Sequence, residues 1–439
     1  MFMGRSRART ENGTFMPSLL HQITDWRNLE RAYGDLVAQF DRQGKSALYA
    51  GMDGVRLTDM ETNASMLLAA ARVDLLEGVG PDPVRTGFVP KSDGSLRPVY
   101  MFSLKDRLKA QAMFRVIAPL VEPQLSPFLF SYRTGRSHHQ AARSVAKRHR
   151  SHHPADTVAR LDLEQYTDRL DHACLRSILP RYDLDQEVIE RLLQFAIAPR
   201  IQQNTLTVSA SGSMTGISVT ALLANMYLND IDAVAGRQAS LYRRVGDDII
   251  ICDKDGEKVQ RILQYLQGTC ADRKLICSEA KTIVTTPGKP FRFLGYEFKD
   301  GKVSLDANAV RRIRHRFRRL FANTHHRKNI QALPERWFCG THSVHAHFVD
   351  ILKCYPYVED DLQMKKLSEH FNHALTRHLF GMYSPRGHRH TLSLMRALKL
   401  PEFYEYFCEL RYGHTRLGSL AASAAWRYQN ALTATATAI

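Results

Sequence analysis

Apolar residues recur every three or four positions along several stretches of the chain, which is the spacing of one face of an α-helix. Further helices are predicted between residue 163 and about residue 198, and through most of the chain beyond residue 306. The two ends of the chain are therefore expected to be mainly helical. The individual helices predicted by this spacing cover residues 23–40, 58–76, 106–121, 257–267 and a largely apolar stretch at 217–231.

Extended segments fill the centre of the chain, and two pairs of them are separated by turn residues. In 88–101, Ser92-Asp93-Gly94-Ser95 lies between two β-rich stretches, which predicts a hairpin. A second hairpin is predicted at 241–252 around Gly246-Asp247-Asp248, and a single strand at 157–163. A β-rich centre between helical ends predicts a mixed α/β (α+β) fold with a helical C-terminal region.

The composition is that of a folded protein with a polyanionic partner. Of 439 residues, 44% are hydrophobic and 24% charged, which excludes a disordered chain. No apolar run approaches the ~18 residues of a membrane span, and no apolar segment follows the charged N-terminus, so we expect a cytoplasmic protein without membrane association. The seven cysteines form no C-x-x-C pair, which argues against a disulfide framework or a thiolate zinc site. An excess of 61 Lys and Arg over 44 Asp and Glu favours nucleic acid as a partner.

Three aspartates occupy positions from which they can converge. Asp162 ends a predicted strand, and Asp247 and Asp248 form the tip of a predicted hairpin, where Gly246 permits the backbone to turn. Clustered carboxylates repel one another unless cations neutralise them, and Mg²⁺ prefers oxygen ligands. Two such ions about 4 Å apart would activate an attacking hydroxyl and stabilise a leaving phosphate. These residues therefore predict nucleotidyl transfer, with a solvated acidic turn as the alternative interpretation.

Two further segments supply groups that could bind a nucleotide. Lys91 and Arg97 bracket the turn at 92–95 and could contact triphosphate oxygens as a point charge and a fork. The sequence from Gly212 to Gly216 precedes the apolar helix and offers backbone that can approach a flat base pair. A surface hairpin with two solvated cations and a plain glycine loop are the respective alternatives.

In order along residues 26–321, these segments resemble bacterial reverse transcriptases of the group II intron-like branch and the related defence-associated (unknown-group) enzymes. The resemblance implies a right-hand polymerase with an N-terminal helical region at 1–87, fingers at 88–155, a palm at 156–300, and a helical thumb with a C-terminal extension at 301–439. The segments that carry it are FVPKSDGSLRPV (88–99), SLKDRLKAQAM (103–113), SYRTGRSHHQAA (131–142), DLEQYTDRLDH (162–172, motif A), GSMTGISVTALLANMYL (212–228, motif B), VGDD (245–248, motif C), LICSEAKT (275–282, motif D) and FLGYEF (293–298, motif E).

The resemblance also assigns roles to individual residues. Asp162, Asp247 and Asp248 would hold Mg²⁺, and Lys281 would donate a proton to the leaving pyrophosphate. Gly295 and Tyr296 of FLGYEF would contact the primer strand. The incoming nucleotide would be contacted by Lys91, Arg97, Tyr166, Thr167 and Gly216.

Three positions depart from the family pattern. Thr167 stands where the family usually has an aromatic ring that excludes a ribose 2′-hydroxyl. Motif B has Met214-Thr215 in place of Pro-Gln, and motif C has Val245 in place of an aromatic residue. We therefore expect a working catalyst with atypical template or sugar selection.

The C-terminal region begins with a strongly basic helical segment. Between residues 306 and 321 apolar side chains share one helical face, and Asp306 is the expected N-cap. The arginines around the rest of the helix, Arg311, Arg314 and Arg318 among them, would bind nucleic acid as part of a thumb, and a solvated basic helix is the alternative. The histidines at 342, 345 and 347 are expected to have polar or packing roles, because no companion ligand pattern accompanies them.

The function implied by the resemblance is DNA synthesis from an RNA template in antiviral defence. Its partners would be an RNA template, with a dedicated noncoding RNA as one candidate, the DNA product, dNTPs, and companion proteins or further copies of the chain. A polymerase that uses ribonucleotides or needs no template is one alternative. A non-catalytic RNA-binding scaffold or intron splicing factor is an alternative of another class.

Overall fold

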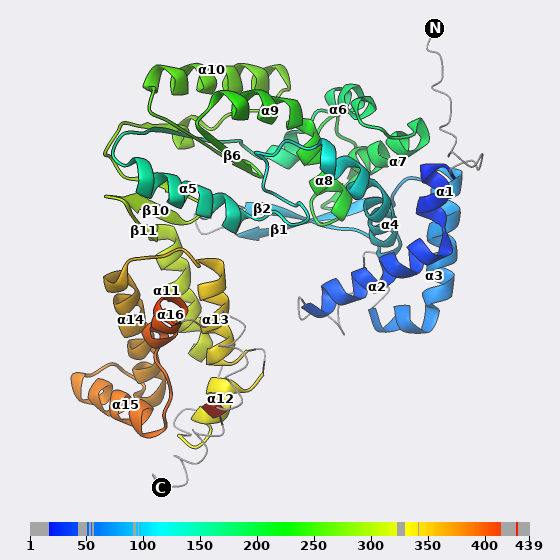
Figure 1. Ribbon diagram of the computed structural model, residues 1–439. Helices are drawn as coiled ribbons and strands as arrows, with labels where there is room; N and C mark the ends of the chain where they lie inside the picture. Colours follow the sequence, from blue (N-terminus) through cyan, green and yellow to red (C-terminus); the bar gives the residue numbers. More distant parts are fainter. Residues whose placement is uncertain are drawn as a thin grey trace, which may run out of the picture. The chain divides into compact units, whose positions relative to one another are not determined.

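A computed structural model describes residues 17–42, 51, 54, 57–90, 94, 96–322, 330–340, 342–413 and 427–428. The chain divides into two compact units (Figure 1). The first unit contains Met1–Ser137 and Ala159–Val284, and the second contains His138–Val158 and Thr285–Ile439. Helices and sheets are both present, so the predicted mixed fold with a helical C-terminal region is confirmed. The predicted boundaries of fingers, palm and thumb stay a prediction.

The first unit contains most of the predicted helices. Those predicted at 23–40, 58–76, 106–121 and 257–267 are confirmed, although the first is split in two before Trp26. The bounds are α1 (Leu19–Thr24), α2 (Trp26–Arg42), α3 (Leu57–Glu77), α4 (Leu104–Val121), η1 (Glu122–Gln124), η2 (Tyr166–Arg169), α6 (His172–Ile178), η3 (Leu179–Arg181), α7 (Gln186–Ile197), α8 (Ser218–Tyr227), α9 (Asn229–Gln238), α10 (Gly256–Asp272) and η4 (Glu279–Lys281).

The single helix predicted over 217–231 is wrong, because the chain forms α8 and α9 there with Leu228 between them. Leu228 has φ −114° and ψ 9°, which is outside the helical region. The next residue, Asn229, accepts a hydrogen bond from the Ser126 backbone N–H at 2.5 Å and donates one to the Gln124 carbonyl at 2.9 Å. These tertiary contacts hold the break, which apolar spacing alone cannot reveal.

Two four-stranded sheets support the first unit. One has the order β2-β1-β4-β5, formed by β1 (Val84–Pro90), β2 (Leu96–Met101), β4 (Arg200–Gln202) and β5 (Thr205–Thr207). The other has the order β6-β7-β3-β8, formed by β3 (Thr157–Asp162), β6 (Leu241–Val245), β7 (Asp248–Asp253) and β8 (Ile283–Thr285). Both predicted hairpins are confirmed, because β1 pairs with β2 and β6 with β7 in antiparallel register.

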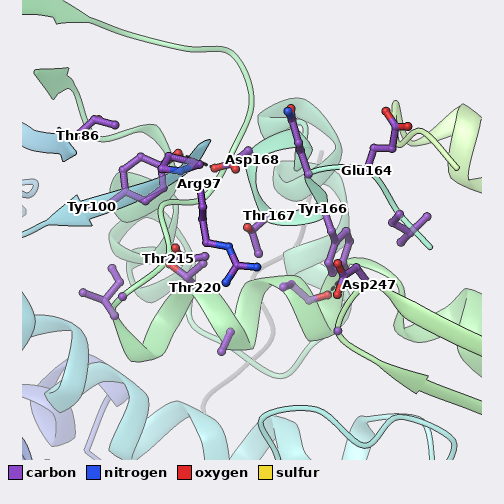
Figure 2. Close-up of a pocket in the computed structure, with 18 of the residues that line it drawn as sticks. Thr86, Arg97, Tyr100, Glu164, Tyr166, Thr167, Asp168, Thr215, Thr220 and Asp247 are labelled. Carbon is purple, nitrogen blue, oxygen red and sulfur yellow. Dashed lines mark hydrogen bonds between the residues drawn. The ribbon is translucent and has the colours of Figure 1, made fainter. Parts of the chain in front are cut away.

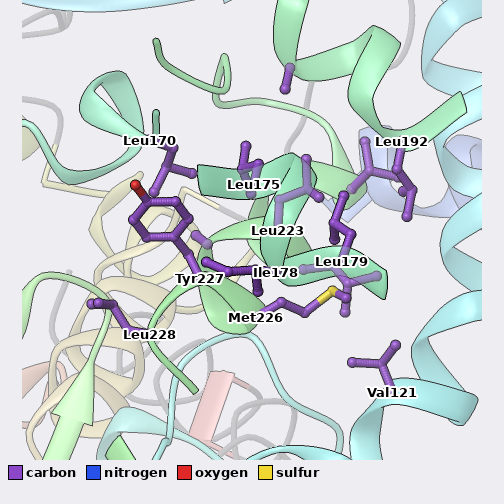
Figure 3. Packing of buried hydrophobic residues seen from close by; sticks show 14 of the residues in the cluster. Val121, Leu170, Leu175, Ile178, Leu179, Leu192, Leu223, Met226, Tyr227 and Leu228 are labelled. Carbon is purple, nitrogen blue, oxygen red and sulfur yellow. The ribbon is translucent and has the colours of Figure 1, made fainter. Parts of the chain in front are cut away.

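A continuous apolar core lies between these sheets and helices. Figure 3 shows part of it, where α6 and η3 pack on α8 through Leu175, Ile178, Leu223 and Met226. Apolar burial of this kind stabilises a fold by roughly 25 cal/mol per Å² of surface removed from water. The core fixes the positions from which the strand ends and turns project their polar side chains.

The second unit combines a small sheet with a helical bundle. The start predicted for the basic helix is confirmed, because α11 begins after Asp306, whose Oδ1 accepts from the Ala309 N–H at 2.7 Å. The elements are α5 (His138–His152), β9 (Phe291–Phe293), β10 (Tyr296–Lys299), β11 (Lys302–Leu305), α11 (Ala307–Ala322), α12 (Leu333–Phe338), α13 (Val344–Cys354), α14 (Asp361–Phe380), α15 (Pro385–Ala397) and α16 (Phe403–Tyr412).

Aromatic rings form the core of this bundle. The Phe317 ring of α11 lies 5.3 Å from Phe371 of α14 and 5.2 Å from Phe403 of α16, centroid to centroid. His345 is buried, and its Nδ1 lies 2.8 Å from the Tyr406 hydroxyl. His345 therefore has the packing role expected from the sequence. No helix among the described residues is long and apolar enough to cross a membrane.

Candidate active site

A pocket of about 940 Å³ opens in the first unit where the two sheets and α8 meet (Figure 2). Its lining comes from separated segments: the β1–β2 hairpin, the end of β3 with η2, β4, the start of α8, the turn after β6, η4 and the single residue Tyr132. The fold therefore brings together segments that are far apart in sequence. The lining includes the predicted residues Arg97, Asp162, Tyr166, Thr167, Gly216, Asp247 and Lys281.

The turn between β6 and β7 directs one carboxylate into this pocket. Val245 pairs with Asp248 in the hairpin, so Gly246 and Asp247 form a two-residue turn. Gly246 has φ +65°, a left-handed conformation that glycine adopts without steric cost. The Asp247 carbonyl accepts a hydrogen bond from the Leu163 N–H at 3.1 Å, which ties the turn to the end of β3. As a result, Asp247 and Asp162 line the same pocket.

The third predicted carboxylate has a different environment. Asp248 is the first residue of β7 and does not line the pocket. Its Oδ1 accepts from the Arg160 guanidinium at 2.7 Å and 3.2 Å. Asp162 is also paired, because its Oδ1 lies 2.8 Å from Lys281 Nζ. The structure records no ion pair for Asp247 among the described residues.

The three carboxylates nevertheless influence one another. Burial raises the pKa of Asp247, and the charges of Asp248 and Asp162 raise it further. The pKa of Lys281 is also raised, first by its hydrogen bond to Asp162 and then by the negative charge of all three aspartates. Negative charge is thus concentrated at this end of the pocket, as the sequence predicted.

The acidic side chains of the pocket fit a divalent cation. Asp162 and Asp247 offer the carboxylate oxygens that hard cations prefer, and burial together with the charge of Asp248 raises the pKa of Asp247. Among the described residues, no three His, Cys, Asp or Glu side chains already converge as a metal cluster. Asp162 and Asp247 would therefore be the residues that hold a divalent cation in this pocket.

A buried ion pair supports the turn from behind. Arg244 is fully buried, and its guanidinium bonds the Asp232 carboxylate at 2.8 Å. The same guanidinium donates to the carbonyls of Gly246 at 3.1 Å and Asn225 at 3.4 Å. Burial acts to lower the pKa of Arg244, but the Asp232 charge outweighs it and the pKa is raised. Arg244 thus remains charged and links the Asp247 turn to α8 and α9.

Residues that follow Asp162 in motif A also line the pocket. The Tyr166 side chain is buried, and its hydroxyl donates to the Ala224 carbonyl. The half-buried Thr167 has a small side chain on the pocket lining, and its carbonyl accepts from the Ser213 N–H at 2.7 Å. Close by, the Tyr100 hydroxyl donates to Asp168 Oδ1 at 2.6 Å (Figure 2). Burial, followed by this bond to Asp168, raises the pKa of Tyr100.

The predicted phosphate-binding residues have different outcomes. Arg97 lies on β2 opposite Val89, and its guanidinium extends into the pocket (Figure 2). Lys91 lies outside the described residues. Gly216 lines the pocket, and its carbonyl accepts from the Arg107 guanidinium at 2.8 Å. Arg97 is therefore the pocket cation best suited to meet a phosphate group.

The residues predicted to contact nucleic acid belong to the second unit. Arg311, Arg314 and Arg318 are exposed on α11, and the ion pairs found among the described residues do not include them. Tyr296 on β10 is 2% exposed, so its ring packs inside this unit. Gly295 has φ +82°, and a Cβ added there would lie 3.0 Å from a ring carbon of Tyr355.

Several functional candidates were not singled out from the sequence. Arg160 could have been found, because side chains two residues apart on a strand share a face and Asp162 follows it at that spacing. Asp168 lies inside the motif A segment, but its bond to Tyr100 joins positions 68 residues apart. Arg244 gives no signal in the sequence, because its burial and its link to Gly246 depend on tertiary packing.

Comparison with known proteins shows which family the central part of the chain resembles. Residues 89–298 match the family described as reverse transcriptase (RNA-dependent DNA polymerase). Protein YkfC of Escherichia coli (strain K12) is 29% identical over 230 residues, which cover 51% of this chain and 58% of that protein. The group II intron-encoded protein LtrA of Lactococcus lactis subsp. cremoris is 24% identical over 285 residues, covering 50% of this chain and 47% of that protein.

A third relative is the uncharacterized 91 kDa protein in cob intron of Schizosaccharomyces pombe, 23% identical over 251 residues, with 53% of this chain and 31% of that protein covered. The chain thus spans 58% or less of the length of each of these relatives. The matched residues 89–298 contain the β1–β2 hairpin and every pocket carboxylate named above. Just under half of the chain, residues 89–298, is therefore similar to the reverse transcriptase family, and a group II intron-encoded protein is among its relatives.

Proposed function

We propose that this protein is an RNA-directed DNA polymerase that adds deoxynucleotides to a primer 3′-hydroxyl with Mg²⁺ as its metal. The observation that carries the proposal is the pocket shared by Asp162, Asp247 and Arg97 within the matched residues 89–298. Two acids and a phosphate-binding cation from separate segments are the groups that phosphoryl transfer needs, because its catalysis consists mainly of positioning and charge stabilisation.

Each side chain then has a role that follows from its environment. Asp162 and Asp247 would hold the divalent cation, which when bound would neutralise the carboxylates and stabilise charge on the phosphate oxygens. Arg97 would bind the triphosphate as a fork. Lys281 stays protonated because its pKa is raised, so it has a proton to give to the pyrophosphate oxygen once it leaves Asp162.

The small side chain at Thr167 supports a second candidate function. A ribose 2′-hydroxyl meets no aromatic ring from position 167, so ribonucleotides would enter the pocket more readily than in relatives with a ring there. A polymerase that uses ribonucleotides is therefore the alternative that the pocket favours.

The partners in this proposal are an RNA template, a DNA product and dNTPs, with companion proteins or further copies of the chain as additional candidates. The biological role would be antiviral defence, which follows from the resemblance to defence-associated enzymes. It predicts that Asp247→Asn removes protection against phage in a host that carries the gene. Protection that survives this substitution would instead favour a non-catalytic RNA-binding scaffold.

Product analysis tests the activity directly. The purified protein, with any RNA that copurifies, is incubated with Mg²⁺ and either dNTPs or rNTPs, and the products are sequenced. The proposal expects DNA complementary to an RNA template. RNA product would favour the ribonucleotide-using alternative, product without a complement would favour template-independent synthesis, and no product under any condition would contradict the proposal.

A further inference from the structure

Arg160 lies beside the carboxylates, yet the proposed reaction gives it no role. Arg160 and Asp162 project from the same face of β3, because side chains two residues apart on a strand share a face. β3 is adjacent to β7 in the sheet, and Asp248 begins β7. The Arg160 Nη2 and Nε atoms lie 2.7 Å and 3.2 Å from Asp248 Oδ1, so two donors hold one oxygen.

Charge explains why such a contact is needed. Three aspartates act on one lysine here, and like charges this close destabilise one another in the metal-free protein. Lys281 offsets Asp162 and Arg160 offsets Asp248, which leaves Asp247 as the carboxylate without an ion pair among the described residues. The Arg160 and Asp248 side chains are 27% and 24% exposed, so solvent screens their attraction only in part.

We propose that Arg160 is a positioning residue that holds Asp248 as a neutral ion pair, so that Asp162 and Asp247 alone form the cation-binding pair of the pocket. Asp248 then contributes to the shape of the turn and not to the cation shell. The inference rests on the proposed function only in taking the pocket as a cation-binding centre.

Mn²⁺ binding tests this inference without any polymerase activity. The purified full chain, without nucleotides, is titrated with Mn²⁺ alone, and free Mn²⁺ is counted by electron paramagnetic resonance. Arg160→Met leaves Asp248 unpaired near the cation and should tighten Mn²⁺ binding by about fivefold or more, because a nearby positive charge is lost. Asp248→Asn leaves Arg160 unpaired and should weaken binding by a similar factor.

The decisive variant removes both partners. Because Arg160→Met with Asp248→Asn deletes a neutral pair, the double variant should bind Mn²⁺ within about twofold of the wild type. Asp162→Asn and Asp247→Asn should each weaken binding by about tenfold or more. If the double variant loses as much affinity as Asp162→Asn, Asp248 is a cation ligand and the inference is wrong.

Thermal unfolding in a chelator supplies a second, metal-free readout. Arg160→Met should lower the melting temperature, and adding Asp248→Asn should recover most of the loss. Arg237→Met, which changes an exposed arginine on α9 in the same unit, is the matched control and should have no effect. If Arg160→Met does not fold, folding of the double variant supports the inference. If neither the double variant nor Arg160→Lys folds, the inference is wrong.

Discussion

The two compact units differ in charge far more than in size. Over its whole sequence the first unit has 33 Lys and Arg against 31 Asp and Glu, so it is nearly neutral. The second unit has 28 Lys and Arg against only 13 Asp and Glu. Of the net charge of +17, the second unit therefore carries +15.

The composition of the whole chain does not reveal this difference in charge between the two units. In the first unit, two basic residues near the pocket are matched by acids, in the pairs of Arg160 with Asp248 and Lys281 with Asp162. In the second unit, Arg311, Arg314 and Arg318 of α11 are exposed, and the ion pairs among the described residues do not include them. The proposed function assigns the local chemistry on a nucleotide to the first unit, and it expects the basic second unit to contact a polyanion.

The largest expected effect concerns the acids of the first unit. Asp162→Asn removes one of the two pocket carboxylates, so we predict that nucleotide incorporation falls by about 10³-fold or more. RNA binding should change by less than about twofold, because the charge excess lies in the second unit. Primer extension and filter binding on one preparation measure both quantities. Equal losses of incorporation and of RNA binding would contradict the assignment of catalysis and RNA binding to different units.

The next largest effect is expected from the buried ion pair of Arg244 and Asp232, which lies behind the Asp247 turn. Arg244→Met leaves Asp232 charged and unpaired in the core, which should lower the free energy of unfolding by about 3–5 kcal/mol. Asp232→Asn together with Arg244→Met should recover part of this loss, because no isolated charge remains. Denaturant unfolding measures the free energy of unfolding of each variant, and Arg237→Met, at an exposed position, is the control. A loss below about 1 kcal/mol would show that the pair does not hold the turn.

A smaller effect is expected on nucleic-acid affinity from α11. Changing Arg311, Arg314 and Arg318 together to Gln should weaken RNA binding by about tenfold or more at low salt and reduce the salt slope by about 3. Incorporation at saturating RNA should be nearly unchanged. Arg312 and Arg316 provide the control, because they are engaged by Tyr355 and Asp350. If their replacement by Gln has the same effect as the triple change, binding depends on net charge and not on this exposed face.

The smallest effect concerns sugar selection in the pocket. Thr167→Tyr introduces a ring that would contact a ribose 2′-hydroxyl, so rNTP incorporation should fall by about tenfold relative to dNTP incorporation. Steady-state incorporation of one matched dNTP and rNTP gives the ratio. Thr86→Tyr, the same substitution at another position of the lining, is the control. An unchanged ratio in Thr167→Tyr would remove position 167 from sugar discrimination.

The sequence predicted the elements and most of the pocket, because these depend on local patterns. Turn residues between β-rich stretches located both hairpins, and the strand that ends at Asp162 was also predicted. Ordered motifs then identified the residues that the fold brings together. What the sequence could not predict depends on packing between distant segments, as in the break at Leu228 and the bond from Tyr100 to Asp168.

The environment of each carboxylate also depends on packing between distant segments, so the sequence could not predict it. Asp247 and Asp248 are neighbours in sequence and looked equivalent as cation ligands. The hairpin register makes Asp247 a turn residue and Asp248 a strand residue beside Arg160, so only the first lines the pocket.

The most direct test of the central claim is incorporation of a single labelled dNTP on an RNA template with a DNA primer. Wild type is compared with Asp247→Asn and with Asp272→Asn, which changes an exposed acid at the end of α10 in the same unit. The account predicts incorporation by wild type and Asp272→Asn, and a loss of about 10³-fold or more in Asp247→Asn. Incorporation by a folded Asp247→Asn variant at the wild-type rate would contradict it.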